Sequence, residues 1–218
     1  EAQPELRTHL TMSFSAFGNI SAIMAIRDYR VFWTGNFLSR SGGWVQRLAI
    51  AWLTWELTQS PAWLGTIGFL SLFPIAALTP FSGAIADRFG IRRTAIIAET
   101  ILALNAFVFA ALTYTGSLTI ELIVVLTLVY SVTASFAIPV FNSLIPDMVP
   151  ADIRSSAIAF NATAGHASTF IGAGAFGLVV SLFDIAGTFV LNGLTFLIFV
   201  YSLIILHLPS EQKSTEPV

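Results

Sequence analysis

Long apolar stretches constrain the fold of this chain more than any other feature of its sequence. An α-helix needs around 20 mainly apolar residues to cross a hydrocarbon core about 30 Å thick. Six stretches meet that length, at residues 31–55, 63–86, 95–115, 120–144, 153–183 and 188–208. They are continuous, whereas the lipid-facing strands of a barrel alternate between apolar and polar residues. We therefore expect an all-α integral membrane protein with six transmembrane helices.

The composition and the missing motifs exclude several classes of protein. Hydrophobic residues make up 56% of the chain and charged residues only 10%, against roughly 25% charged residues in a soluble domain. Ten Lys and Arg residues in a chain of net charge −2 give no basic patch for nucleic acid. The sequence contains no cysteine, no phosphate-binding loop, no hydrolase or zinc motif and no cluster of metal ligands. We therefore expect no enzyme activity, no metal and no other cofactor.

The Lys and Arg residues outside the expected spans fall on one side of the membrane. Positively charged residues near the ends of spans are retained on the cytoplasmic side. That side, including the leading segment and the end of the chain, carries Arg7, Arg27, Arg30, Arg88, Arg92, Arg93, Arg154 and Lys213. The opposite side carries only acidic charges, at Glu56, Glu121 and Asp184. We therefore expect both termini to be cytoplasmic.

A short motif of glycines and charged residues lies between the second and third expected spans. Its defining positions are Gly83, Asp87, Arg88, Gly90, Arg92 and Arg93. This motif resembles the loop signature of the major facilitator superfamily, which carries it at the same place between spans. Gly90 suits a turn with positive φ, Gly83 permits close helix approach, and the arginines can anchor the loop at anionic headgroups. Asp87 is positioned to pair with them or to face a helix amino terminus. The alternative is an ordinary loop that obeys the positive-inside rule.

The resemblance extends along most of the chain. Residues 27–33, 44–46 and 57–65 are similar to the opening of a bacterial exporter branch that includes siderophore and drug efflux members. Residues 149–154, followed by Asn161, resemble the same branch's loop into the fifth span. The family implies half of a twelve-helix fold, built from two three-helix inverted repeats, with a substrate cavity between two halves and alternating access.

The resemblance also implies an organisation and a function. Residues 1–30 would be a cytoplasmic amino-terminal segment, 31–208 a six-helix transmembrane bundle and 209–218 the start of a cytoplasmic linker. The chain would be the amino-terminal half of a secondary transporter in a bacterial cytoplasmic (inner) membrane, exporting small amphipathic or anionic compounds. Its partners would be the lipid bilayer, a small-molecule substrate and a second six-helix half, from the same longer chain or from another copy.

Two departures from the family pattern keep a second function open. No Lys or Arg lies between Arg93 and Arg154, so the family's usual arginine in span four is absent. Residues 172–177 lack the proline that antiporters commonly carry in span five. Both losses weaken a proton-antiport interpretation. They favour the alternative of a non-transporting membrane scaffold or assembly protein that retains the transporter fold.

Two arginines inside the first span are candidate substrate ligands. Arg40 and Arg47 are seven residues apart, which puts them on one helix face about 10 Å apart. Charges within a span face a cavity or a partner because exposure to lipid is costly, so we expect both, with Gln46, to line the substrate pathway and attract anions. The alternative is that Arg40 extends to the headgroups and Arg47 pairs with a carboxylate.

Two further ionisable residues, Glu99 and His166, are candidates for proton coupling. For Glu99, pairing with Arg92, Arg93 or Arg40 is the favoured alternative. For His166, the favoured alternative is a buried neutral ring bonded to a backbone carbonyl. Small residues in the same span lie at i, i+4 spacing, which permits close helix packing. These candidate packing residues are Ser168, Gly172, Ala173 and Gly177.

Overall fold

The computed structural model describes residues 20–83, 88 and 90–207. Helices make up the described part of the chain, which contains no strand. The five long helices are α2 (Arg27–Thr58), α3 (Pro61–Leu78), α5 (Ile91–Tyr114), α6 (Ile120–Leu144) and α7 (Arg154–Ile205). The short 3₁₀ turns are η1 (Thr79–Phe81), η2 (Ile145–Asp147) and η3 (Ala151–Ile153). The all-α architecture expected from the sequence is therefore confirmed for these residues.

Four of the helical stretches are long and apolar enough to cross a membrane. They are Pro61–Phe81, Ile91–Tyr114, Ile120–Asp147 and Ala151–Ile205. Helix α2 has ample length, with 32 residues, but polar residues such as Arg40 and Arg47 interrupt its apolar sequence. Near Pro80, α3 passes into the 3₁₀ turn η1, as expected where a proline lacks the backbone N–H that an α-helix needs.

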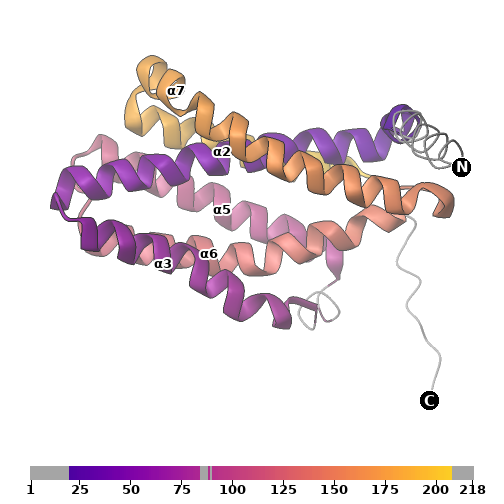
Figure 1. Ribbon diagram of the computed structural model, residues 1–218, viewed down its shortest axis with the longest axis horizontal. Helices are drawn as coiled ribbons and strands as arrows, with labels where there is room; N and C mark the ends of the chain where they lie inside the picture. Colours follow the sequence, from indigo (N-terminus) through magenta and orange to yellow (C-terminus); the bar gives the residue numbers. More distant parts are fainter. Residues whose placement is uncertain (1–19, 84–87, 89, 208–218) are drawn as a thin grey trace, which may run out of the picture.

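Helix α7 is divided at Asp184. This residue has φ 58° and ψ −174°, whereas the 52-residue helix is otherwise continuous. Figure 1 shows α7 doubling back on itself at one end of the bundle. The carboxylate of Asp184 accepts a hydrogen bond of 2.7 Å from the backbone N–H of Gly187, so it caps the segment that follows. Asp184 lies between the spans expected at 153–183 and 188–208, so the two segments of α7 correspond to these two spans.

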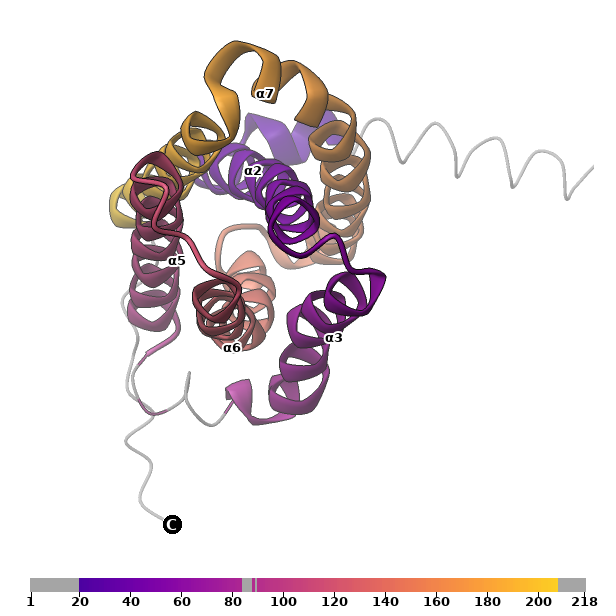
Figure 2. The same ribbon diagram turned by 90° about the vertical axis from the view of Figure 1, so that its left-hand side faces the viewer.

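Helix α2 lies between the two segments of α7 (Figure 2). On the first segment, a Cβ at Gly172 would lie 2.7 Å from the Cβ of Trp44 and would collide with the carbonyl oxygen of Ser41. On the other side, Gly42 of α2 is similarly close to the side chains of Asn192 and Thr195, which lie on the second segment of α7. Glycines on both sides therefore allow α2 to pack closely against α7, as small residues do between membrane helices.

The start of α2 and both ends of α7 meet at one end of the bundle. The hydroxyl of Tyr29 donates a 2.9 Å hydrogen bond to the carbonyl of Ala157, and Arg27 Nη1 lies 3.1 Å from His207 Nδ1. A cluster of buried apolar residues fills this end; its members include Phe32, Phe141, Leu144, Phe199 and Leu203. A second cluster, which includes Ile50, Leu53, Phe109, Ile123 and Phe189, fills the opposite end. The two clusters leave a more polar region between them.

The predicted packing residues of the fifth span divide into two pairs. Ser168 is fully buried, and Gly172 contacts α2 as described above. By contrast, Ala173 and Gly177 are exposed, and a Cβ at Gly177 would have no atom within 4 Å. Ala173 and Gly177 therefore pack against no other described helix, because α2 contacts the other face of this segment, and their packing role stays a prediction.

Candidate functional site

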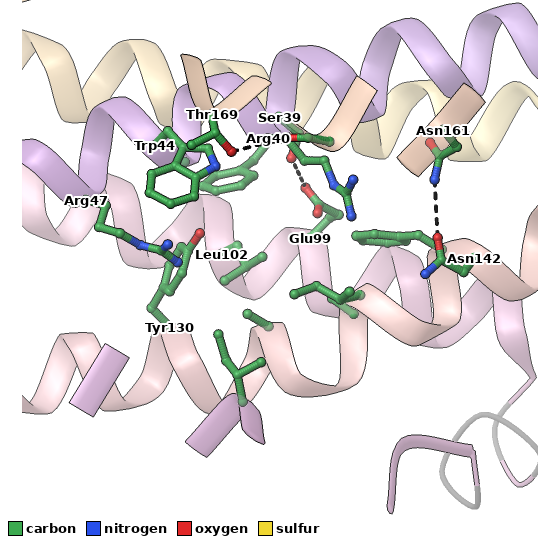
Figure 3. A pocket seen from close by; sticks show the side chains of 18 of the residues that line it. Ser39, Arg40, Trp44, Arg47, Glu99, Leu102, Tyr130, Asn142, Asn161 and Thr169 are labelled. Carbon is green, nitrogen blue, oxygen red and sulfur yellow. Dashed lines mark hydrogen bonds between the residues drawn. The ribbon is translucent and has the colours of Figure 1, made fainter. Parts of the chain in front are cut away.

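A cavity of about 500 Å³ lies in the polar region of the bundle. Side chains from α2, α3, α5, α6 and α7 line it, as the close view in Figure 3 shows. Its polar lining residues are Ser39, Arg40, Trp44, Arg47, Glu99, Tyr130, Asn142, Asn161, His166 and Thr169. The cavity therefore brings together four candidates from the sequence: Arg40, Arg47, Glu99 and His166.

Helix α2 contributes both arginines to the cavity wall. Their spacing of seven residues puts both guanidinium groups on the face that lines the cavity. Arg47 lies over the ring of Trp44, one helical turn earlier, with its guanidinium carbon 4.4 Å from the ring centroid. This cation–π contact holds the charge of Arg47 at an aromatic surface rather than at a carboxylate.

A glycine of α7 makes room for Arg40. A Cβ at Gly165 would lie only 2.5 Å from Arg40 Nη1, so any larger residue there would displace the guanidinium group. Two cavity residues, Gly165 and Tyr130, were missed by the sequence reasoning; Tyr130 is drawn beside Arg47 in Figure 3. An isolated glycine and a tyrosine in apolar runs carry no periodic signal of a site.

Glu99 is the one carboxylate that lines the cavity within the described part of the chain. It is only 1% exposed, and its Oε2 accepts a hydrogen bond of 3.2 Å from the Ser39 hydroxyl. Arg40 points toward it in Figure 3, but no ion pair within 4.0 Å joins them among the described residues. Pairing with Arg92 is wrong, because that side chain instead donates a 3.0 Å hydrogen bond to a carbonyl near the end of α7. Arg93 is exposed, and it forms no ion pair with Glu99 either.

The structure corrects two further expectations. Gln46 does not line the main cavity; it is buried, and its Oε1 accepts a hydrogen bond from Asn192 Nδ2. One residue of an α-helix turns the chain by about 100°, so Gln46 reaches α7 and shares with Arg47 only a small recess beside the main cavity. His166 lines the cavity but is exposed rather than buried, because it lies on the open face of α7. The expected buried histidine is therefore wrong.

Three asparagines form a hydrogen-bonded chain across one side of the cavity. Asn36 Nδ2 donates to Asn161 Oδ1 at 3.0 Å, and Asn161 Nδ2 donates to Asn142 Oδ1 at 3.2 Å. These hydrogen bonds between side-chain amides join α2, α7 and α6. The sequence reasoning missed it as a site, although three amides within apolar runs are a usable signal in a membrane protein.

Comparison with known proteins decides the family. Residues 20–216 match the family model described as transmembrane secretion effector. The chain belongs to this family of major facilitator superfamily transporters. Its members are transporters rather than enzymes, which confirms the expectation of a membrane protein without enzyme activity.

A curated relative supports the same assignment. The chain is 22% identical over 179 residues to the protein named Staphyloferrin A transporter of Staphylococcus aureus (strain NCTC 8325 / PS 47). The match covers 82% of this chain and 45% of that protein. This member of the transmembrane secretion effector family thus spans less than half the length of the curated relative it matches.

The loop motif of this transporter family is partly described. Asp87 lies outside the described residues. Gly90 has φ 86° and precedes α5, so the expected positive φ is confirmed. A Cβ at Gly83 would have no atom within 4 Å, so among the described residues no helix approaches Gly83 closely, and its packing role stays a prediction. Arg92 holds the start of α5 to the end of α7 through a backbone carbonyl, and Arg88 is exposed.

Proposed function

We propose that this chain is the six-helix amino-terminal half of a secondary transporter, organised as two three-helix inverted repeats. Helices α2, α3 and α5 would form the first repeat, and α6 with the two segments of α7 the second. Three observations support this arrangement: the family assignment, the division of α7 at Asp184, and the chain's coverage of 45% of a longer transporter. A second half, from the same chain or another copy, would close the cavity and permit alternating access.

We propose that the transporter exports small amphipathic or anionic compounds. The observation that carries this proposal is the excess of positive charge in the cavity, where two arginines, Arg40 and Arg47, share the described lining with one carboxylate, that of Glu99. Arg47 has an aromatic ring as its close neighbour, which leaves its guanidinium N–H groups available to an anion. A planar guanidinium binds carboxylate and similar groups through paired hydrogen bonds. The family's description as a secretion effector supports export as the direction.

Coupling and orientation complete the proposal. Glu99 and His166 line the same cavity as the arginines, so a proton taken up there would change the charge that the substrate meets. Both termini would lie in the cytoplasm of a bacterial cell, with the protein in the cytoplasmic (inner) membrane. Arg27 and Arg92 each contact residues near the end of α7, so both lie at that end of the bundle, which agrees with a single positively charged side.

Substitution of the arginines tests the function. Arg40→Gln and Arg47→Gln keep some hydrogen bonding but remove the charge, so each should weaken transport of anionic substrates by the complete protein in vesicles while sparing neutral ones. Arg154→Gln is the matched control, because that exposed arginine lies outside the cavity. Unchanged anion transport by both cavity variants would contradict the proposal. An absence of any transport by the wild-type protein would instead favour the scaffold alternative.

A further inference from the structure

A small recess adjoins the cavity between α2, α3 and α6. Its volume is about 10 Å³, and Gln46, Thr127 and Tyr130 are among the residues that line it. Two buried atoms on its walls, Gln46 Nε2 and Thr127 Oγ1, have no hydrogen-bond partner among the described residues. The two residues are only 1% and 2% exposed. Buried polar groups without a partner are rare in proteins and call for an explanation.

The hydrogen bonds around Gln46 engage its oxygen and leave its nitrogen without a partner among the described residues. Asn192 Nδ2 donates to Gln46 Oε1, and Asn192 Oδ1 in turn accepts a 3.1 Å hydrogen bond from the hydroxyl of Thr195. These contacts use the oxygen of each amide as an acceptor, so the orientation of both amides is consistent with the network. The N–H groups of Gln46 therefore remain as donors without an acceptor on a residue that lines the recess.

The hydroxyl of Thr127 is also available to the recess. A threonine inside a helix commonly donates to the carbonyl one turn earlier, and Thr133 of the same helix does so, with a 2.7 Å bond to Val129. Thr127 makes no such bond. Its own carbonyl accepts a 2.9 Å bond from the Ser131 hydroxyl, so only the hydroxyl of Thr127 lacks a partner.

We propose that this recess binds one water molecule, held by Gln46 Nε2 and Thr127 Oγ1. A buried water needs about 10–15 Å³ of space and two to four polar partners, which this recess provides. The water accepts a hydrogen bond from the Gln46 amide and exchanges one with the Thr127 hydroxyl. A metal cation does not fit, because Gln46 presents N–H donors and Arg47 lines the same recess.

The site also extends the chemistry of the cavity. Gly43, Arg47 and Tyr130 line both spaces, so the water lies beside the guanidinium group that we assign to anion binding. In this respect the inference rests on the proposed function: a substrate oxygen held by Arg47 would hydrogen-bond to this water or displace it. The water site itself is independent of transport.

Thr127→Val tests the site through the sign of its effect on stability. Valine has nearly the same shape but no hydroxyl. If the water is bound, the substitution removes one of its partners, and the melting temperature of the purified complete protein should fall by about 2–4 °C. If the recess is dry, the substitution removes an unpartnered buried hydroxyl, and the melting temperature should stay unchanged or rise. Either of these last results would overturn the proposal.

Two further measurements keep the test decisive. Thr133→Val is the matched control, since the hydroxyl of that half-buried threonine is already bonded within its own helix and does not line this recess, and it should leave the melting temperature unchanged. An experimental map of the complete protein that resolves other buried waters should show a peak about 2.7–3.2 Å from Gln46 Nε2 and Thr127 Oγ1. The absence of that peak would reject the site even if Thr127→Val fails to fold. Neither readout requires transport, so a failure here is distinguishable from a failure of the proposed function.

Discussion

Gly172→Ala should destabilise the protein by forcing two helices apart. The added Cβ would lie 2.7 Å from the Cβ of Trp44, and it would also collide with the carbonyl oxygen of Ser41. Two carbon atoms pack best about 3.5–4.0 Å apart, so α2 and α7 would have to separate by roughly 1 Å. Because the atoms met are backbone or sit next to it, no rotation of a flexible side chain can relieve the contact.

The size of the effect follows from the cost of overpacking. An extra methyl group forced into a packed interior costs about 1–3 kcal/mol, and each kcal/mol lowers the melting temperature of a domain of about 150–250 residues by about 2–4 °C. Gly177→Ala is the matched control on the same helix, since its Cβ would have no atom within 4 Å. Alanine also favours helix over glycine by up to about 1 kcal/mol, so this control should be neutral or stabilising.

Thermal unfolding of the purified complete protein, followed by tryptophan fluorescence, would measure both variants. The predicted result is a lower melting temperature for Gly172→Ala alone. An unchanged melting temperature in that variant would refute the reasoning about close packing of α2 on α7. An equal fall in both variants would show that alanine is unfavourable in this helix for reasons unrelated to the contact.

Three further predictions follow from the site and the topology. Gly165→Ala should displace the guanidinium of Arg40 and weaken anion transport in vesicles several-fold, with little change in melting temperature; normal transport would contradict the assigned position of Arg40. Asn161→Ala should cost about 1–3 kcal/mol because it leaves a buried amide without its partner, and an unchanged midpoint of thermal unfolding would argue against the amide chain. A cysteine at Ser117, in a chain with no native cysteine, should react with an impermeant thiol reagent added outside the cell; reaction from the cytoplasm alone would reverse the proposed orientation.

The sequence predicted the helices better than it predicted the side chains that face the cavity. The expected span 120–144 has the same bounds as α6, and the span 95–115 begins and ends within four residues of the ends of α5, because long apolar runs bounded by polar loops locate membrane helices well. Arg40 and Arg47 were also placed correctly on one face, since their spacing alone determines it.

The errors arose where the rotation of a helix decides the outcome. Lipid is as apolar as a protein interior, so apolar periodicity does not tell which face of a membrane helix packs and which meets lipid. Gln46 was grouped with Arg47 although it faces α7, and His166 was expected to be buried although it lies on an open face. The partner of Glu99 was missed for a related reason, because Ser39 lies on another helix and no sequence spacing connects the two.

The division of α7 at a single residue has a mechanical consequence. Only Asp184 departs from helical geometry between the two segments, whereas a longer loop could absorb a displacement of either one. The first segment carries Asn161 and Gly165 at the cavity, and the second carries Asn192 and packs on the other side of α2. A tilt of the first segment would therefore be transmitted to the second, and α2, held between them, would move as part of the same rigid body.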